Sequence, residues 1–196
     1  REMKTGTAVP TEEQLSRVKH HFIGNLSIHE SYNAGRFEEE AMKLLGRLFP
    51  LHPVVVMTGG SMLYIDAVCR GIDDLPAADT ELRERLVRQY QTEGIESLRF
   101  GLKQLDPDYY HRVDLQNPKR LLHALEVTIL SGKPYSRHLT SRHKTRPFRV
   151  MRIELNAPRA TLYERINRRV DQMIEGGLEE EARSLYPFRA ANALNT

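Results

Sequence analysis

The 196-residue sequence predicts an α/β fold in which a parallel sheet core carries an all-helical insertion. A continuous apolar, β-branched run at residues 54–57 stops at two glycines, and an apolar pattern of helical spacing follows it, as is typical of a buried parallel strand and its helix. Strand signal returns at residues 150–155. Between these stretches the signals are helical only. The sequence therefore predicts a discontinuous α/β core at residues 1–75 and 147–196, with a helical insertion at residues 76–146.

Composition favours a packed protein and says little about its partners. Apolar residues make up 40% of the chain and charged residues 28%, which is the balance of a globular protein. The formal net charge of +3 permits a polyanionic partner without requiring one. Cys69 is the single cysteine, which argues against a disulfide framework and fits a reducing, cytoplasmic setting. No apolar run is as long as a membrane span, and we expect no membrane contact.

Helix signals account for most of the chain. A capping-box pattern at Thr11 predicts a helix over residues 11–19. Apolar residues at helical spacing predict a second helix over residues 33–48, before Pro50. Acidic runs such as residues 38–40 and 179–181 are expected on solvated helix faces. Further helices are expected near residues 62–69, 79–91, 95–105, 106–112, 118–130, 161–175 and, after the glycine pair, up to about residue 186.

The corner between the predicted strand and the helix after it is the first candidate site. Gly59 and Gly60 would let backbone N–H groups approach a ligand closely, and the free N–H groups of a helix start favour an anion such as a diphosphate. The Ser61 hydroxyl would add another donor. The alternative is a tight turn in which Ser61 serves only as the N-cap. Both interpretations remain open on this stretch alone.

The helix expected at residues 161–175 is the second candidate. At 100° per residue, Arg169 lies about 20° from the first residue of an apolar stripe. An arginine that faces the interior needs an anion, because an unpaired buried charge costs several kcal/mol. Either a core carboxylate or a bound phosphate could supply that anion. The stripe consists of Leu162, Ile166, Val170 and Met173.

A basic surface on the insertion is the third candidate. Residues 133–149 contain no aspartate or glutamate, and they hold a series of basic residues with Tyr135 and Phe148 among them. This pattern fits a phosphate backbone as partner, with aromatic rings available to stack on bases. The alternative is a solvated surface that happens to be basic. No histidine or acidic spacing is typical of a metal site, so no protein-ligated metal centre is expected.

Five stretches in colinear order resemble the tRNA dimethylallyltransferase family, whose members prenylate the adenosine beside the anticodon. They are MKTGTAVPTEEQ, KHHFIGNLSIHESYNAGRFEEEA, VVVMTGGSMLYIDAVCRGIDDLPAAD, NPKRLLHALEVTILSGKP and RINRRVDQMIEGGLEEEARSLY. The resemblance covers nearly the whole chain and is more specific than any single motif. It implies a sheet core related to P-loop nucleotide-binding proteins and an insertion that grips the tRNA anticodon stem-loop. It also implies a tunnel that admits dimethylallyl diphosphate from one side and a flipped-out adenine from the other.

The resemblance implies roles for individual residues. Ser61 stands where the family usually has threonine and would contact both the diphosphate and the substrate base, beside the diphosphate-binding Gly59 and Gly60. Arg169 matches the arginine that binds the diphosphate, so Ser61 and Arg169 are the candidate catalytic residues. The residues that match tRNA-contacting positions are Ser61, Arg83, Lys119, Arg120, Leu121, Leu122 and His123, the last of which replaces a common arginine.

The reaction that the resemblance implies is transfer of the dimethylallyl group to the exocyclic amine of that adenosine, which gives isopentenyladenosine. Mg²⁺ would be bound mainly through the diphosphate, and a monomer is expected. The family's P-loop and its aspartate base would lie before Arg1, so we expect the chain to be an incomplete enzyme. A prenyltransferase for free adenine nucleotides and a catalytically silent tRNA-binding protein are the alternative hypotheses, and the basic insertion argues against the first.

Overall fold

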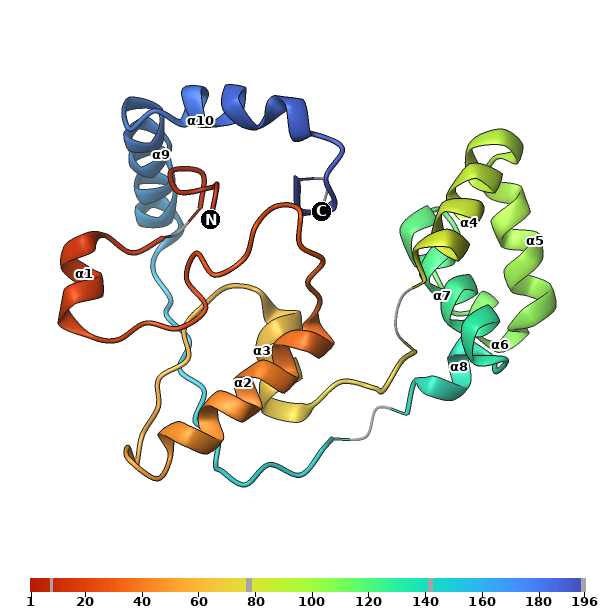
Figure 1. Cartoon of the computed structure of the whole chain (residues 1–196), viewed down its shortest axis with the longest axis horizontal. Coiled ribbons are helices and arrows are strands. Elements are labelled where there is room, and N and C mark those ends of the chain that lie inside the picture. The colour runs from red at the N-terminus through yellow and green to blue at the C-terminus, as the bar shows by residue number, and fades with distance from the viewer. Residues whose placement is uncertain (8, 77–78, 141–142, 195–196) are drawn as a thin grey trace. The chain divides into compact units, whose positions relative to one another are not determined.

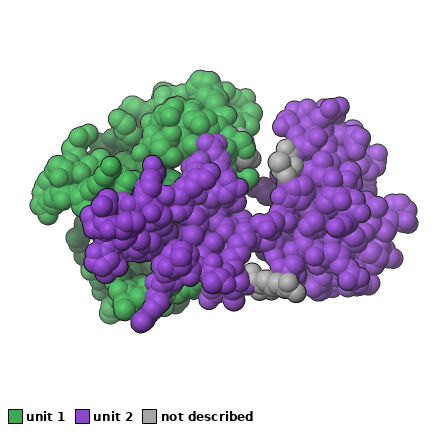
Figure 2. Space-filling model, turned by 60° about the horizontal axis from the view of Figure 1, so that its bottom comes forward, with its two compact units in different colours: residues 1–33, 150–196 green, residues 34–149 purple. Residues whose placement is uncertain are grey.

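Helices joined by irregular segments make up the computed structural model (Figure 1). Its contacts divide the chain into two units, unit 1 with residues 1–33 and 150–196 and unit 2 with residues 34–149 (Figure 2). Unit 2 thus combines the predicted insertion with part of the predicted core, and the predicted domain boundaries themselves stay a prediction. The structure describes residues 1–7, 9–76, 79–140 and 143–194.

The described residues of unit 1 form three α-helices and two short 3₁₀ helices. Helix α1 begins with the predicted capping box, since Thr11 Oγ1 accepts from the Gln14 N–H at 3.3 Å and Gln14 Oε1 accepts from the Thr11 N–H at 2.9 Å. The predicted break at the glycine pair is confirmed, because α9 ends and α10 begins there. The elements are α1 (Glu12–Arg17), α9 (Arg159–Glu175), α10 (Leu178–Leu185), η1 (Tyr186–Phe188) and η2 (Asn192–Leu194).

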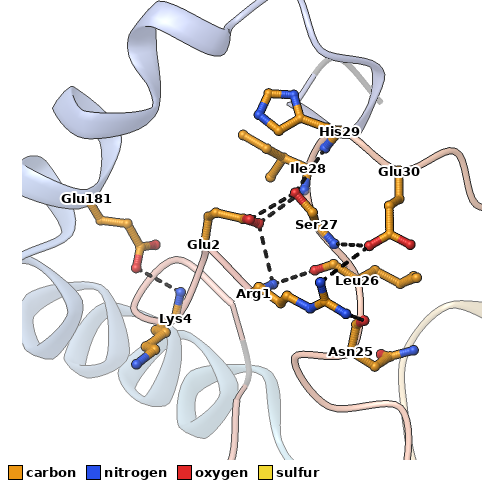
Figure 3. Close-up of polar contacts among 10 residues, drawn as sticks. All are labelled: Arg1, Glu2, Lys4, Asn25, Leu26, Ser27, Ile28, His29, Glu30 and Glu181. Atoms are coloured by element: carbon orange, nitrogen blue, oxygen red, sulfur yellow. Dashed lines mark hydrogen bonds and ion pairs between the residues drawn. The ribbon is translucent and has the colours of Figure 1, made fainter.

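Two carboxylates anchor the N-terminal segment within unit 1 (Figure 3). Glu2 accepts from the Ser27 hydroxyl at 2.8 Å and from the Ile28 N–H at 3.1 Å, and these bonds lower the pKa of Glu2 to about 2. Glu181 of α10 accepts from the N–H groups of Lys4, Thr5 and Gly6 at 2.7–2.9 Å. Partial burial raises the pKa of Glu181, but these backbone donors outweigh it and lower the pKa overall. The prediction that the 179–181 run is merely solvated was therefore wrong for Glu181.

In unit 2, helices α2 (Ala34–Leu48) and α3 (Met62–Arg70) confirm two predicted helices and pack against each other. Small side chains form their contact, where Ala41 and Ala67 are buried. The Phe37 and Tyr64 rings lie 5.2 Å apart beside it. The helix before the predicted corner therefore supports the helix that follows the corner.

The remaining helices of unit 2 form a bundle, in which four helices have ends within about two residues of those predicted, while the short helix at residues 135–138 was not predicted. Helix α5 packs against α4, α6 and α7, and α8 packs against α6 and α7 (Figure 1). The helices are α4 (Thr80–Glu93), α5 (Ile95–Leu105), α6 (Pro107–Tyr110), α7 (Pro118–Ser131) and α8 (Tyr135–His138). Their shared core consists of Leu82, Leu86, Leu98, Leu102, Leu121, Leu122, Ala124 and Leu125.

Asp106 connects three segments of this bundle. Its side chain is fully buried and accepts from the Tyr109 N–H at 3.0 Å, which caps α6. It also accepts from the Ser136 N–H at 2.7 Å and from the Ser136 hydroxyl at 2.8 Å, which holds α8 in place. One carboxylate thus satisfies three donors that would otherwise lack partners.

The predicted parallel sheet core was wrong, because no residue that the structure describes lies in a strand. Residues 54–57 and 150–155 are irregular segments whose side chains are exposed except for the half-buried Val55, and the exposed fraction reaches 83% at Val56 and 94% at Leu155. β-Branched composition expresses only a preference for pleated surfaces. A sheet also requires hydrogen bonds to a neighbouring strand, and no strand lies within the described residues.

Candidate functional site

The glycine corner leads into α3 and is open. Ser61 is the N-cap residue of α3, and its carbonyl accepts from the N–H groups of Tyr64 at 3.0 Å and Ile65 at 3.1 Å. Its side chain makes no capping hydrogen bond, so the alternative of Ser61 as a side-chain N-cap does not describe this geometry. A Cβ added at Gly59 or Gly60 would meet no atom within 4 Å. The corner therefore presents a hydroxyl and backbone N–H groups to open space.

Arg169 lies on α9 in unit 1 and is exposed. The apolar stripe beside it is also uncovered, with exposed fractions of 41% at Leu162 and 54% at Ile166. Within the described part of the chain Arg169 forms no salt bridge, whereas the neighbouring Arg168 pairs with Glu164 at 2.7 Å. The predicted inward orientation of Arg169 was wrong, because no described residue of α9 is buried. The core-carboxylate alternative has no partner in the described residues, and the phosphate alternative stays a prediction that follows from the resemblance. Ser61 belongs to unit 2 and Arg169 to unit 1.

The bundle brings basic and aromatic residues together around α7. Arg120 lies in the first turn of α7 and is exposed, as is Lys119. Burial raises the pKa of the Tyr109 hydroxyl, and the positive charge of Arg120 partly offsets that rise. The Tyr135 ring meets the Tyr109 ring edge to face at a centroid distance of 4.8 Å. We call this group, extended by His123 and Arg83, the α7 surface.

His123 and Arg83, the other two members of the α7 surface, both interact with Glu126. Arg83 of α4 donates from Nη1 to Glu126 Oε2 at 2.6 Å, and its own side chain is 47% exposed. The His123 ring lies 5.4 Å from the Tyr135 ring, edge to face. Burial lowers the pKa of His123, the Glu126 charge opposes this shift, and the Arg83 charge adds to it. Four of the residues matched to tRNA contacts, Arg83, Lys119, Arg120 and His123, thus belong to one helical bundle.

Two other residues in the matched segment point into the core. Leu121 is 0% exposed and Leu122 is 8% exposed, and both pack in the bundle core. Their predicted tRNA contact stays a prediction, but their side chains anchor α7. The charged neighbours Lys119 and Arg120 are the exposed members of this segment that can reach a phosphate.

Part of the predicted basic tract is neutralised within unit 2. Arg146 donates from Nη2 to Glu38 Oε1 at 2.6 Å and to the Ala67 carbonyl at 2.7 Å. Lys144 Nζ donates to Asp74 at 2.8 Å and lies 3.4 Å from Glu38. Glu38 is buried, which corrects the expectation that the 38–40 run is solvated. The signal was available, because Glu38 lies on the apolar face of α2 at helical spacing from buried alanines.

A family model described as IPP transferase matches residues 1–196, the entire chain. The chain belongs to the IPP transferase family. Its relatives include tRNA dimethylallyltransferase 1 of Bacteroides fragilis, which is 54% identical over 195 residues, and tRNA dimethylallyltransferase 1 of Bacteroides thetaiotaomicron, which is 52% identical over 195 residues. Each alignment covers 100% of this chain, but only 65% and 63% of the two relatives. The family resemblance seen in the sequence is thereby confirmed.

A solved structure is similar as well. The crystal structure of the full-length tRNA isopentenylpyrophosphate transferase from Bacillus halodurans superposes with a TM-score of 0.59 at 32% sequence identity. The match covers 100% of this chain and 61% of that one. This IPP transferase family member therefore spans somewhat less than two thirds of the relatives that it matches.

No helix in the described part of the chain has the length and apolar character needed to cross a membrane. In the same residues no group of three or more histidine, cysteine, aspartate or glutamate side chains could hold a metal ion.

The lowered pKa of His123 predicts a pH dependence for this IPP transferase family member. The folded state holds the His123 proton less tightly than the unfolded state, so His123 contributes stability that is present above its ordinary pKa of 6.5 and is lost as the pH falls through the lower, folded value. We expect the free energy of unfolding, measured by urea denaturation, to fall between pH 7.5 and pH 5.5.

Two substitutions test the source of this effect. His123→Leu is expected to flatten the pH dependence of the unfolding free energy, whereas the exposed His111→Leu in the same bundle should leave it in place. An unchanged dependence in His123→Leu would assign the effect to other groups.

Proposed function

We propose that the chain is part of a tRNA dimethylallyltransferase, which transfers a dimethylallyl group from dimethylallyl diphosphate to the exocyclic amine of the adenosine beside the tRNA anticodon. The product is isopentenyladenosine. The observation that carries this proposal is the match of all 196 residues to the family, with relatives of more than half identity that bear this name. The exposed basic side chains of the α7 surface support tRNA as the prenyl acceptor.

The candidate residues are assigned to the negative charge that develops on the departing diphosphate. The amine nitrogen attacks C1 of the dimethylallyl group, the bond from C1 to oxygen breaks, and diphosphate departs with the negative charge. Donors aimed at those oxygens stabilise the transition state. We assign this role to the Ser61 hydroxyl, the backbone N–H groups at Gly59 and Gly60, and the Arg169 guanidinium. The amine gives its proton to a general base, which the resemblance places before Arg1.

Further properties belong to the same proposal. Mg²⁺ would be held by phosphate oxygens of the substrate, since the described residues lack an acidic ligand cluster. A P-loop-like nucleotide-binding segment would complete the diphosphate site. The enzyme would act as a cytoplasmic monomer, with the anticodon stem-loop bound at the bundle.

A prenyl-transfer assay tests the function directly. The complete protein is incubated with radiolabelled dimethylallyl diphosphate and either a tRNA transcript or AMP, and product is counted. Label is expected in tRNA and not in AMP, and Ser61→Ala should lower its rate of appearance. Prenylation of AMP alone would replace the proposal with a free-nucleotide prenyltransferase. Binding of tRNA without any transfer would indicate the silent tRNA-binding protein.

Arg120→Ala should weaken tRNA binding with little effect on bound-state chemistry. An exposed arginine at a phosphate contributes through counterion release, so its loss should reduce the slope of log Kd against log salt concentration by about one. Filter binding at several salt concentrations measures this slope. Arg88→Ala is the matched control, because Arg88 is an exposed arginine on α4 that pairs with Glu84 at 3.6 Å. An unchanged slope of log Kd against log salt concentration in Arg120→Ala would show that Arg120 does not contact a tRNA phosphate.

A further inference from the structure

Glu126 is a buried carboxylate in the middle of α7. Its side chain is 4% exposed, and its neighbours Leu125 and Val127 on the same helix are buried as well. Its Oε2 accepts from Arg83 at 2.6 Å, while its Oε1 is buried without a hydrogen-bond partner in the described structure. Burial of a charged carboxylate is costly, and an apolar residue of similar size would commonly serve the fold as well. Glu126 therefore calls for a reason other than packing.

The contact with Arg83 supplies such a reason. The guanidinium group carries five N–H donors in a rigid fork, and only Nη1 is used by Glu126. The Arg83 side chain is 47% exposed, so the rest of the fork remains accessible to a partner. A carboxylate fixed within α7 thus sets the orientation of an arginine that extends from α4. Planar forks bind phosphates in defined geometry, which makes orientation matter more than it would for lysine.

We propose that Glu126 is a positioning residue for tRNA binding, which orients the guanidinium of Arg83 toward the RNA phosphate backbone. The proposal rests on the proposed function, since it needs RNA as the ligand of the α7 surface. It makes a prediction opposite to that of simple electrostatics. Removal of a negative charge beside a phosphate-binding surface should by itself strengthen RNA binding, whereas loss of the orienting contact should weaken it.

Filter binding of a tRNA transcript to the full chain tests whether loss of the Glu126 carboxylate weakens or strengthens RNA binding. Glu126→Met, which replaces the carboxylate with an apolar side chain of similar length, is expected to raise Kd about tenfold, the scale of one charge-assisted contact. This substitution should also reduce the slope of log Kd against log salt concentration by about one. Glu126→Gln keeps an acceptor oxygen for Arg83 and should restore most of the affinity. Glu84→Gln, which removes an exposed charge from the same α4, should not raise Kd.

A double-mutant cycle separates positioning from a purely structural effect. If Glu126 acts through Arg83, then Glu126→Met has no further effect on Kd in an Arg83→Met background. An equal loss in both backgrounds, or tighter binding by Glu126→Met alone, overturns the proposal. If Glu126→Met does not fold, as judged by circular dichroism, the tRNA affinity of Arg83→Lys tests the proposal instead. A loss of affinity as large as that in Arg83→Met supports an oriented guanidinium group, and full affinity in Arg83→Lys overturns the proposal.

The outcomes also separate this inference from the proposed function. If the parent chain binds no tRNA and transfers no prenyl group, the proposed function fails. If the parent binds tRNA and every Glu126 variant binds equally well, only the positioning role fails.

Discussion

Arg169→Ala is expected to lower the turnover number for prenyl transfer at least about 100-fold, the scale measured when one donor to a developing oxyanion is removed. Arg169 lies beside the uncovered stripe of α9 and makes no salt bridge within the described residues. Its charge is therefore available for a bound anion. The leaving diphosphate gains negative charge in the transition state, so the loss should appear in turnover as well as in substrate affinity.

Single-turnover measurements on the complete protein with saturating dimethylallyl diphosphate would quantify the loss. Arg168→Ala is the matched control, because Arg168 is the adjacent exposed arginine and pairs with Glu164 of the same helix at 2.7 Å. It should change the rate less than about fivefold, since surface pairs contribute about 1 kcal/mol or less. Equal rates for Arg169→Ala and the parent would show that the assigned role is wrong.

Asp106→Ala is expected to lower the free energy of unfolding by about 3 kcal/mol, the second large effect. Hydrogen bonds to a charged group contribute about 1.5–3 kcal/mol each, but removal of a buried carboxylate also removes its desolvation cost, so the net loss is smaller than the sum of the bonds. The substitution removes three such bonds at once, from the Tyr109 N–H and from the Ser136 N–H and hydroxyl. The cap of α6 and the anchor of α8 are lost together.

Urea denaturation followed by circular dichroism measures this change. Asp108→Ala is the matched control, because Asp108 is exposed on the same short helix α6 and should cost less than about 0.5 kcal/mol. Asp106→Asn keeps one acceptor oxygen and should lose less stability than alanine. A cost below 1 kcal/mol for Asp106→Ala would show that water replaces the carboxylate without penalty.

Local patterns were sufficient to predict the longer helices, whereas the short α8 and the two 3₁₀ helices were not predicted. The capping box at Thr11, the apolar spacing over residues 33–48 and the proline at the start of α7 each act over a single helical turn or face. The family resemblance was equally accessible, because it rests on the order of five stretches. The roles of Ser61 and Arg169 stay predictions that follow from that resemblance.

Contacts between distant segments were not accessible in the same way. Three acidic residues that form fixed bonds were missed or assigned to solvated faces: Glu38, Glu126 and Glu181. Whether a carboxylate is solvated or bonded depends on which donor the fold brings to it, and these donors come from far along the chain. The sheet prediction failed for a related reason, since a strand depends on a neighbour and not on composition alone.

By itself, the sequence determined the helices, their caps and the family, because each depends on residues close together or on their order. Only the tertiary structure decided that Leu121 and Leu122 face a core while Arg120 faces solvent, and that Glu126 reaches across from α7 to Arg83. It also decided that residues 54–57 remain irregular, with Val54, Val56 and Met57 exposed. Burial and pairing are properties of neighbours in space, and their free energies arise when the chain brings those neighbours together.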